Sequence, residues 1–218
     1  MALLYLVRHG ETTWNREGRF QGQADAPLSD LGREQASRVA ERLRATGLGV
    51  VVASDLSRAR DTAQAVAEAA GVPLVLEPAF RELSFGLWQG STRAEIEARF
   101  GDALRAYLSD PDHGRAEGGE SFAEAMVRVR SAADRLLRER REERMAWVMH
   151  GGSIRALLCA YLDWPARRRG VYRLDNAGVS LLEVRPAEGF VSLHYLNDTH
   201  HLGGPRERPG RSPGGDAF

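Results

Sequence analysis

The feature that most constrains this chain is an alternation of short apolar runs with longer stretches of helical periodicity. Apolar runs at 3–7, 50–53 and 74–76 predict buried strands. Between them, residues 31–46 and 57–70 carry apolar side chains at the i, i+3, i+4, i+7 spacing of an amphipathic helix. Strands that alternate with helices pair in parallel through right-handed crossovers. The pattern therefore predicts an α/β fold, a three-layer α/β/α sandwich with a mostly parallel sheet.

The rest of the chain extends this pattern after a looser middle region. It predicts three more helices and three more strands, the helices at 92–100, 121–140 and 154–161 and the strands at 146–149, 179–184 and 190–196. The length suits one domain, which we place at 1–202. Residues 203–218 are rich in Gly, Pro and Arg without periodicity, and we expect this tail to be disordered.

Composition excludes several kinds of function. Thirty acidic and thirty basic residues cancel, so we expect neither nucleic acid nor a membrane as a partner. All thirty basic residues are arginine, which excludes a lysine Schiff base and the lysine-bearing phosphate loop. The single cysteine, Cys159, lies in an apolar run and is interpreted as a buried hydrophobe. The apolar N-terminus is interrupted by Arg8, so no signal peptide or membrane span is predicted, and we expect a cytoplasmic location.

Polar residues follow the predicted strands at the point where each strand ends. Arg8-His9-Gly10 follows the first strand, residues 54–60 follow the second, and His150-Gly151-Gly152 follows the strand at 146–149. The carboxyl ends of parallel strands meet at one edge of a sheet, where α/β folds bind ligands. Arginine binds phosphate through a planar fork, and glycine lets backbone N–H groups approach an anion. The sequence therefore predicts a phosphoryl-binding pocket that contains two histidines.

These motifs resemble those of the histidine phosphatase superfamily, also called the phosphoglycerate mutase-like family. The resemblance covers about residues 3–202 and rests on blocks that occur in the family's order. The blocks are Leu6–Thr12 with Trp14-Asn15, Gly18–Gly22, Pro27-Leu28-Ser29, Ser54–Ala59, Arg81-Glu82-Leu83, Gly118–Ser121 and His150–Gly152. The family implies a phosphoglycerate mutase-like fold.

The resemblance also implies roles for individual residues. His9 would be the nucleophile that accepts the phosphoryl group as a phosphohistidine, which water later releases. Glu82 would be the general acid that protonates the leaving alkoxide and then, deprotonated, activates water. The phosphoryl oxygens would be clamped by Arg8, Arg58 and His150.

Further residues would complete this pocket. The Asn15 side chain and the Gly151 N–H would assist the phosphoryl clamp, and Gln21 and Gly22 would line the substrate side. We expect neither a metal nor a cofactor, because arginines and a histidine supply the charge that phosphoryl transfer requires. The expected partner is a small-molecule phosphomonoester, and the expected assembly is a monomer or a homodimer.

Three functions compete. The first is a metal-independent phosphatase that hydrolyses small phosphomonoesters, the second is a phosphoglycerate mutase, and the third is a non-catalytic phospho-ligand-binding protein. Mutases are similar to one another in a Glu-Arg-His-Tyr-Gly-like segment and carry a later insert with paired arginines. In this chain Glu82 is followed by Leu83-Ser84-Phe85-Gly86, and Arg115 stands alone in the corresponding loop. This departure favours the phosphatase branch.

Some polar and aromatic side chains have structural interpretations instead. Asp55 is predicted to cap a helix, and Arg60 is predicted to form a surface ion pair. His200-His201 would point in opposite directions on an extended chain, which argues against a metal pair. Trp14 and Trp88 fit either a pocket wall or the core.

Overall fold

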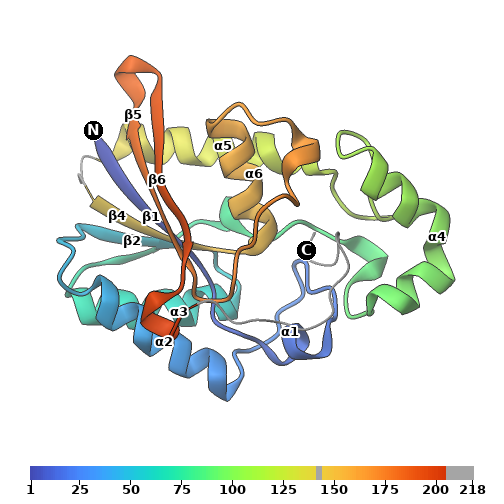
Figure 1. Cartoon of the computed structure of the whole chain (residues 1–218), viewed down its shortest axis with the longest axis horizontal. Coiled ribbons are helices and arrows are strands. Elements are labelled where there is room, and N and C mark those ends of the chain that lie inside the picture. The colour runs from blue at the N-terminus through green and yellow to red at the C-terminus, as the bar shows by residue number, and fades with distance from the viewer. Residues whose placement is uncertain (141–143, 205–218) are drawn as a thin grey trace.

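The fold is built on one six-stranded sheet, and the computed structural model describes residues 1–140 and 144–204. The strands are β1 Ala2–Arg8, β2 Val50–Ala53, β3 Leu74–Leu76, β4 Arg144–Met149, β5 Val179–Arg185 and β6 Phe190–Asp198. Their order is β3-β2-β4-β1-β5-β6 (Figure 1). The first four are parallel, and β5 and β6 add an antiparallel pair beside β1. The mostly parallel sheet that the sequence predicted is confirmed.

Helices cover both faces of the sheet and give the three predicted layers. The helices are α1 Thr13–Glu17, α2 Asp30–Leu43, α3 Ser57–Ala70, α4 Arg93–Ser109, α5 Phe122–Glu139 and α6 Gly151–Tyr161. Figure 1 shows α2 and α3 on one face and α5 and α6 on the other. The protein has two hydrophobic cores, and β1 contributes side chains to both. Leu4 and Leu6 pack into one core, and Val7 packs into the other.

The helices α4 and α1 depart most from the sequence prediction, and α6 begins at Gly151 instead of the predicted Ile154. The helix predicted to end at Phe100 continues to Ser109, although Phe100 itself has a non-helical backbone (φ −137°, ψ 33°). The chain resumes helical geometry because Leu104 and Tyr107 bury their side chains in the core. The short helix α1 was not predicted, since five residues without a buried member give no periodicity to detect.

Asp55 was wrongly predicted to cap α3. The cap position belongs to Leu56, and Asp55 lies one residue too early. Its carboxylate instead accepts hydrogen bonds from the Arg81 fork, with Nε 2.7 Å from Oδ1. This ion pair ties the loop after β2 to the residue that precedes Glu82.

The other structural interpretations had mixed outcomes. Arg60 does form a surface ion pair, with Asp61 at 3.0 Å. The assumption of an extended chain at His200-His201 was wrong, because His200–Leu202 is a 3-10 helix. Trp88 is buried in the core with its ring 5.6 Å from that of Tyr107, and neither Trp14 nor Trp88 lines the pocket described below.

Two predictions concern the environment of the chain. Cys159 is buried, as predicted, and burial raises the pKa of its thiol to about 11. Among the described residues, no helix combines the length and apolar character needed to cross a bilayer. The predicted disordered tail falls almost entirely on residues 205–218, which lie outside the described part of the chain.

Candidate active site

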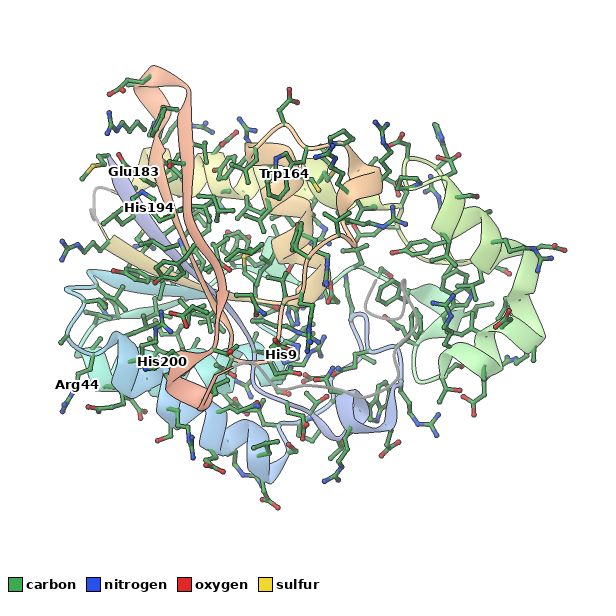
Figure 2. All side chains as sticks on the ribbon, in the orientation of Figure 1. His9, Arg44, Trp164, Glu183, His194 and His200 are labelled. Atoms are coloured by element: carbon green, nitrogen blue, oxygen red, sulfur yellow. The ribbon has the colours of Figure 1, made fainter. Side chains whose placement is uncertain are left out.

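A pocket of about 130 Å³ opens where β1 ends, and it gathers most of the predicted site residues. Its lining includes Arg8, His9, Asn15, Gln21, Gly22, Arg58 and Glu82. Figure 2 shows His9 near the middle of the molecule, well apart from His194 and Glu183 on the β5–β6 pair. Residues from five separate stretches of sequence thus meet in one cavity. The ends of β1 and β2 contribute to it as predicted, whereas His150 and Gly151, which follow β4, are not among its lining residues.

His9 and His150 form the buried centre of the site. Their ring centroids are 5.0 Å apart, and both side chains are almost fully buried. His9 Nδ1 lies 2.7 Å from the carbonyl oxygen of Gly10. A carbonyl oxygen can only accept, so this contact places the proton of neutral His9 on Nδ1 and leaves the Nε2 lone pair available.

Both histidines are held neutral. Burial lowers the pKa of His9 well below its ordinary value, and the charges of Arg58 and Arg8 lower it further. Burial likewise lowers the pKa of His150, with Arg58, His9 and Arg8 adding to the effect. Among the described residues, neither ring nitrogen of His150 has a hydrogen-bonding partner. The Nε2 of His9 and the ring nitrogens of His150 are therefore available to bind a ligand.

Arg58 extends from α3 into the pocket and is held by backbone carbonyls. Its Nη1 donates to Ala24 O at 2.8 Å, and its Nη2 donates to Gly22 O at 2.7 Å. Burial lowers the pKa of Arg58 to about 10, so the group stays cationic at neutral pH. Its Nε is buried and, within the described residues, donates to no protein atom. The guanidinium is thus fixed in place, and its Nε–H remains available to a ligand.

Arg8 lies at the end of β1 and is anchored by a hydrogen bond from Nη1 to Leu174 O. Gly151, the first residue of α6, lies beside it: a Cβ at Gly151 would come within 3.5 Å of Arg8 Nε. Glycine at this position lets the start of α6 approach the Arg8 guanidinium closely. A helix N-terminus next to an arginine favours an anion in the space between them.

Glu82 is docked on the start of α6. Its Oε2 accepts from Gly152 N at 3.0 Å, and its Oε1 accepts from Ser153 N at 3.2 Å and Leu83 N at 2.9 Å. A Cβ on Gly152 would lie 2.3 Å from Glu82 Oε1. Gly152 is therefore required for this close contact between the carboxylate and the helix.

Several pocket residues escaped the sequence analysis. Arg155 on α6 is 2% exposed, and it lines the pocket together with Arg93, Arg173 and Asp175. Only Arg155 carried a usable signal, because an arginine within the apolar run of α6 is unusual. The others belong to elements whose place next to His9 no local pattern reveals.

Thr62 and Asn176 were also given no role in advance. Thr62 Oγ1 accepts from Gly10 N at 3.1 Å and donates to Arg58 O at 2.7 Å, so it joins the turn after β1 to α3. Asn176 Nδ2 donates to His9 O at 3.1 Å. These two buried side chains hold the peptide group that joins the nucleophile candidate His9 to Gly10.

Cations dominate the lining of the pocket. It contains six arginines and two carboxylates, those of Glu82 and Asp175. Asp175 is already paired with Arg173 at 3.0 Å, and hydrogen bonds and these charges lower its pKa although burial opposes them. The pocket is chemically suited to a small anion that a neutral histidine can attack.

Comparison with known proteins agrees with this chemistry. A family model described as the histidine phosphatase superfamily (branch 1) matches residues 4–199. The chain belongs to the histidine phosphatase superfamily. The resemblance predicted from the sequence motifs is thereby confirmed, and the chain is an enzyme of this superfamily.

Relatives of this histidine phosphatase carry several names. It is 36% identical to the probable phosphoglycerate mutase GpmB of an Enterobacter species, over 94% of this chain and 97% of the relative. Among solved structures, Bacillus stearothermophilus YhfR is 30% identical with a TM-score of 0.86, covering 93% of this chain and 100% of that one. A mycobacterial glucosyl-3-phosphoglycerate phosphatase solved with VO3 is 34% identical with a TM-score of 0.81, covering 90% of this chain and 99% of that one.

Proposed function

We propose that this chain is a metal-independent phosphatase that hydrolyses small phosphomonoesters through a phosphohistidine on His9. The observation that carries the proposal is the state of His9: a buried, neutral imidazole whose Nδ1 faces Gly10 O, in a pocket lined with arginines. Such a histidine is a nucleophile at Nε2, and the surrounding cations stabilise the charge of a transferring phosphoryl group.

In the first step, the lone pair of His9 Nε2 attacks phosphorus, and the bond from phosphorus to the leaving oxygen breaks. Glu82, in its carboxylic acid form, gives its proton to that oxygen, so the alcohol leaves neutral. Arg8, Arg58 and His150 bind the phosphoryl oxygens, assisted by Asn15 and the Gly151 N–H. Charge on the equatorial oxygens is thus met by fixed donors rather than by a metal.

In the second step, the Glu82 carboxylate accepts a proton from water while the water oxygen attacks phosphorus. The bond between phosphorus and Nε2 breaks, inorganic phosphate forms, and Glu82 is protonated again for the next cycle. The start of α6 and Leu83 fix the position of the Glu82 carboxyl group for both steps through three backbone N–H groups.

The pocket favours small substrates that carry a second negative charge. Arg93 contributes positive charge to the lining in addition to the arginines that we assign to the phosphoryl group, whereas Arg173 is paired with Asp175. This positive charge would attract a substrate carboxylate that lies near the phosphoryl group. Such a carboxylate is present in the substrates after which the mycobacterial glucosyl-3-phosphoglycerate phosphatase and the Entamoeba histolytica phosphoserine phosphatase are named.

Mutase activity is the second candidate, because the relatives named probable phosphoglycerate mutase GpmB share up to 37% identity with this chain. A panel of p-nitrophenyl phosphate, phosphoserine, α-ribazole phosphate and phosphoglycerates separates the two functions. Free phosphate and isomerised phosphoglycerate are measured in the same reactions, with and without a chelator. A phosphatase releases phosphate and makes no isomer. Isomerisation faster than release would identify a mutase, and neither product would indicate a binding protein.

A further inference from the structure

Asn15 and Asn176 form a pair of amides beside His9, and backbone groups fix the orientation of both. The N–H of Thr12 can only donate, so the Asn15 atom 3.1 Å from it is the oxygen, Oδ1. The carbonyl of His9 can only accept, so the Asn176 atom 3.1 Å from it is the nitrogen, Nδ2. The O and N atoms of the two amides are therefore assigned by their neighbours.

The two amides are also in contact with each other. Asn176 Nδ2 donates to Asn15 Oδ1 at 3.2 Å. Oδ1 of Asn15 also lies within hydrogen-bonding distance of Thr12 N and Thr12 Oγ1, both at 3.1 Å. All these donors lie on the oxygen side of the Asn15 amide. Its Nδ2 is thereby turned the other way, and Asn15 lines the pocket.

We propose that Asn176 is a positioning residue that keeps the Nδ2 of Asn15 directed at the phosphoryl group. The inference rests on the proposed function, which places a phosphoryl group in this pocket. An amide turned by 180° would offer an oxygen to the anion in place of an N–H donor, which converts attraction into repulsion. Asn176 opposes that turn together with the N–H of Thr12, because each of these donors can only pair with an oxygen. The Asn176 side chain also donates to the His9 carbonyl. One residue therefore positions both the backbone of the nucleophile and Asn15, which binds the phosphoryl group.

Asn176 can do this because its own loop is anchored to the end of β1. The N–H of Ala177 donates to Arg8 O at 2.9 Å, and the N–H of Arg8 donates to Gly178 O at 3.2 Å. Asn176 is 6% exposed, so water does not compete readily for its amide. Ala177 has a φ of 56°, a left-handed backbone that the surrounding contacts must stabilise.

The test is a double-mutant cycle read by inhibition with orthovanadate and inorganic phosphate. Asn176→Ala removes the N–H donor to Asn15 Oδ1 and His9 O without adding a negative charge that would itself repel the anions. We expect both anions to bind roughly tenfold to a hundredfold more weakly, the worth of one hydrogen bond to a charged group. Asn15→Ala should cause a loss of similar size. The double variant should bind no more weakly than Asn15→Ala, within about twofold, because Asn176 acts on the anion through Asn15.

Asn197→Ala is the matched control. Asn197 braces the same loop through Asp175, with Asp175 N 2.7 Å from its Oδ1 and Asp175 Oδ2 2.9 Å from its Nδ2, and it contacts neither Asn15 nor His9. Any loss that it causes should multiply with that of Asn15→Ala. If Asn176→Ala does not fold, as judged by its thermal midpoint, Asn176→Leu replaces it in the cycle.

Two results would overturn the inference while leaving the proposed function intact. The first is an Asn176 variant that binds vanadate as tightly as the wild type. The second is a cycle in which the losses from Asn15 and Asn176 multiply, or in which Asn197 is coupled to Asn15 as strongly as Asn176 is. A wild-type protein that binds neither anion would instead overturn the proposed function, and this inference with it.

Discussion

At the scale of single residues, the site depends on keeping His9 neutral while the arginines around it stay charged. His9 acts only if its Nε2 is unprotonated, and burial with two nearby arginines provides this. Arg58 stays charged although it is buried, since its lowered pKa of about 10 remains far above neutrality. The same cations therefore attract the substrate and keep the nucleophile neutral.

Glu82→Gln tests the acid and base roles. With phosphoserine, a poor leaving group, kcat should fall on the order of a hundredfold or more, because the amide cannot transfer the proton. With p-nitrophenyl phosphate, the first burst of p-nitrophenol should persist while steady turnover slows, since phosphohistidine forms but is not hydrolysed. Both are measured by stopped flow. Glu183→Gln, on β5 and well apart from His9 in Figure 2, is the control. Phosphoserine turnover near the wild-type rate in the Glu82 variant would contradict the role.

The neutral histidines can be observed directly. In the ligand-free protein, the ring carbon signals of His9 and His150 should show no titration step near pH 6.5, because the pKa of each lies well below that value. A titration of His9 near pH 6.5 would contradict the account of its neutral state.

At this scale, the sequence revealed the residues that stand next to strand ends. Arg8, His9 and His150 follow apolar runs directly, so the position of the strands predicts where they meet. Asn176 could not be found this way. It precedes an antiparallel strand, and its role depends on a contact with Asn15, 161 residues away, which no local pattern encodes.

At the scale of elements, α6 is the organising helix of the site. It begins directly after β4 and presents free N–H groups to Glu82, while Gly151 and Gly152 keep its first turn open to close contacts. The sequence analysis placed the start of this helix at Ile154, because glycines give no apolar periodicity. The pattern of apolar side chains therefore gives no sign of this functional first turn.

Gly152→Ala tests the contact between α6 and Glu82. The added Cβ would lie 2.3 Å from Glu82 Oε1 and 2.7 Å from Leu83 Cδ1, so the carboxylate must move. We expect kcat to fall by roughly tenfold to a hundredfold, which is the cost of misplacing a reacting group by about 1 Å. Gly170→Ala is the matched control, because nothing lies within 4 Å of its Cβ position. Equal kcat values for the two variants would show that Glu82 tolerates displacement.

At the scale of the whole molecule, buried neutral histidines link stability to pH. The pKa values of His9 and His150 are lowered in the folded chain, whereas the unfolded chain binds protons at both near pH 6.5. Below that pH the unfolded state binds more protons, so the stability of the fold decreases as pH falls. His201 adds a smaller effect of the same sign, since burial and Arg42 lower its pKa to about 4 while part of it stays exposed.

Urea denaturation at a series of pH values checks this linkage. The free energy of unfolding should decrease from pH 7.5 to pH 5, with a slope that approaches about 1.4 kcal/mol per pH unit for each histidine that remains neutral in the fold. His150→Gln should make the slope shallower. A stability that stays level or rises toward pH 5 would contradict the buried neutral state of these side chains.

The central claim is the phosphohistidine on His9, and trapping it is the most direct test. The protein is mixed with ³²P-labelled phosphoserine, quenched in alkali within milliseconds, digested and analysed by mass spectrometry. The account predicts label that is stable in alkali, lost in acid, confined to the peptide containing His9, and absent from His9→Ala, which should not turn over substrate. His194→Ala, with its side chain at the surface of β6, should label as the wild type does. Turnover that persists in His9→Ala, or label on another residue, would contradict the claim.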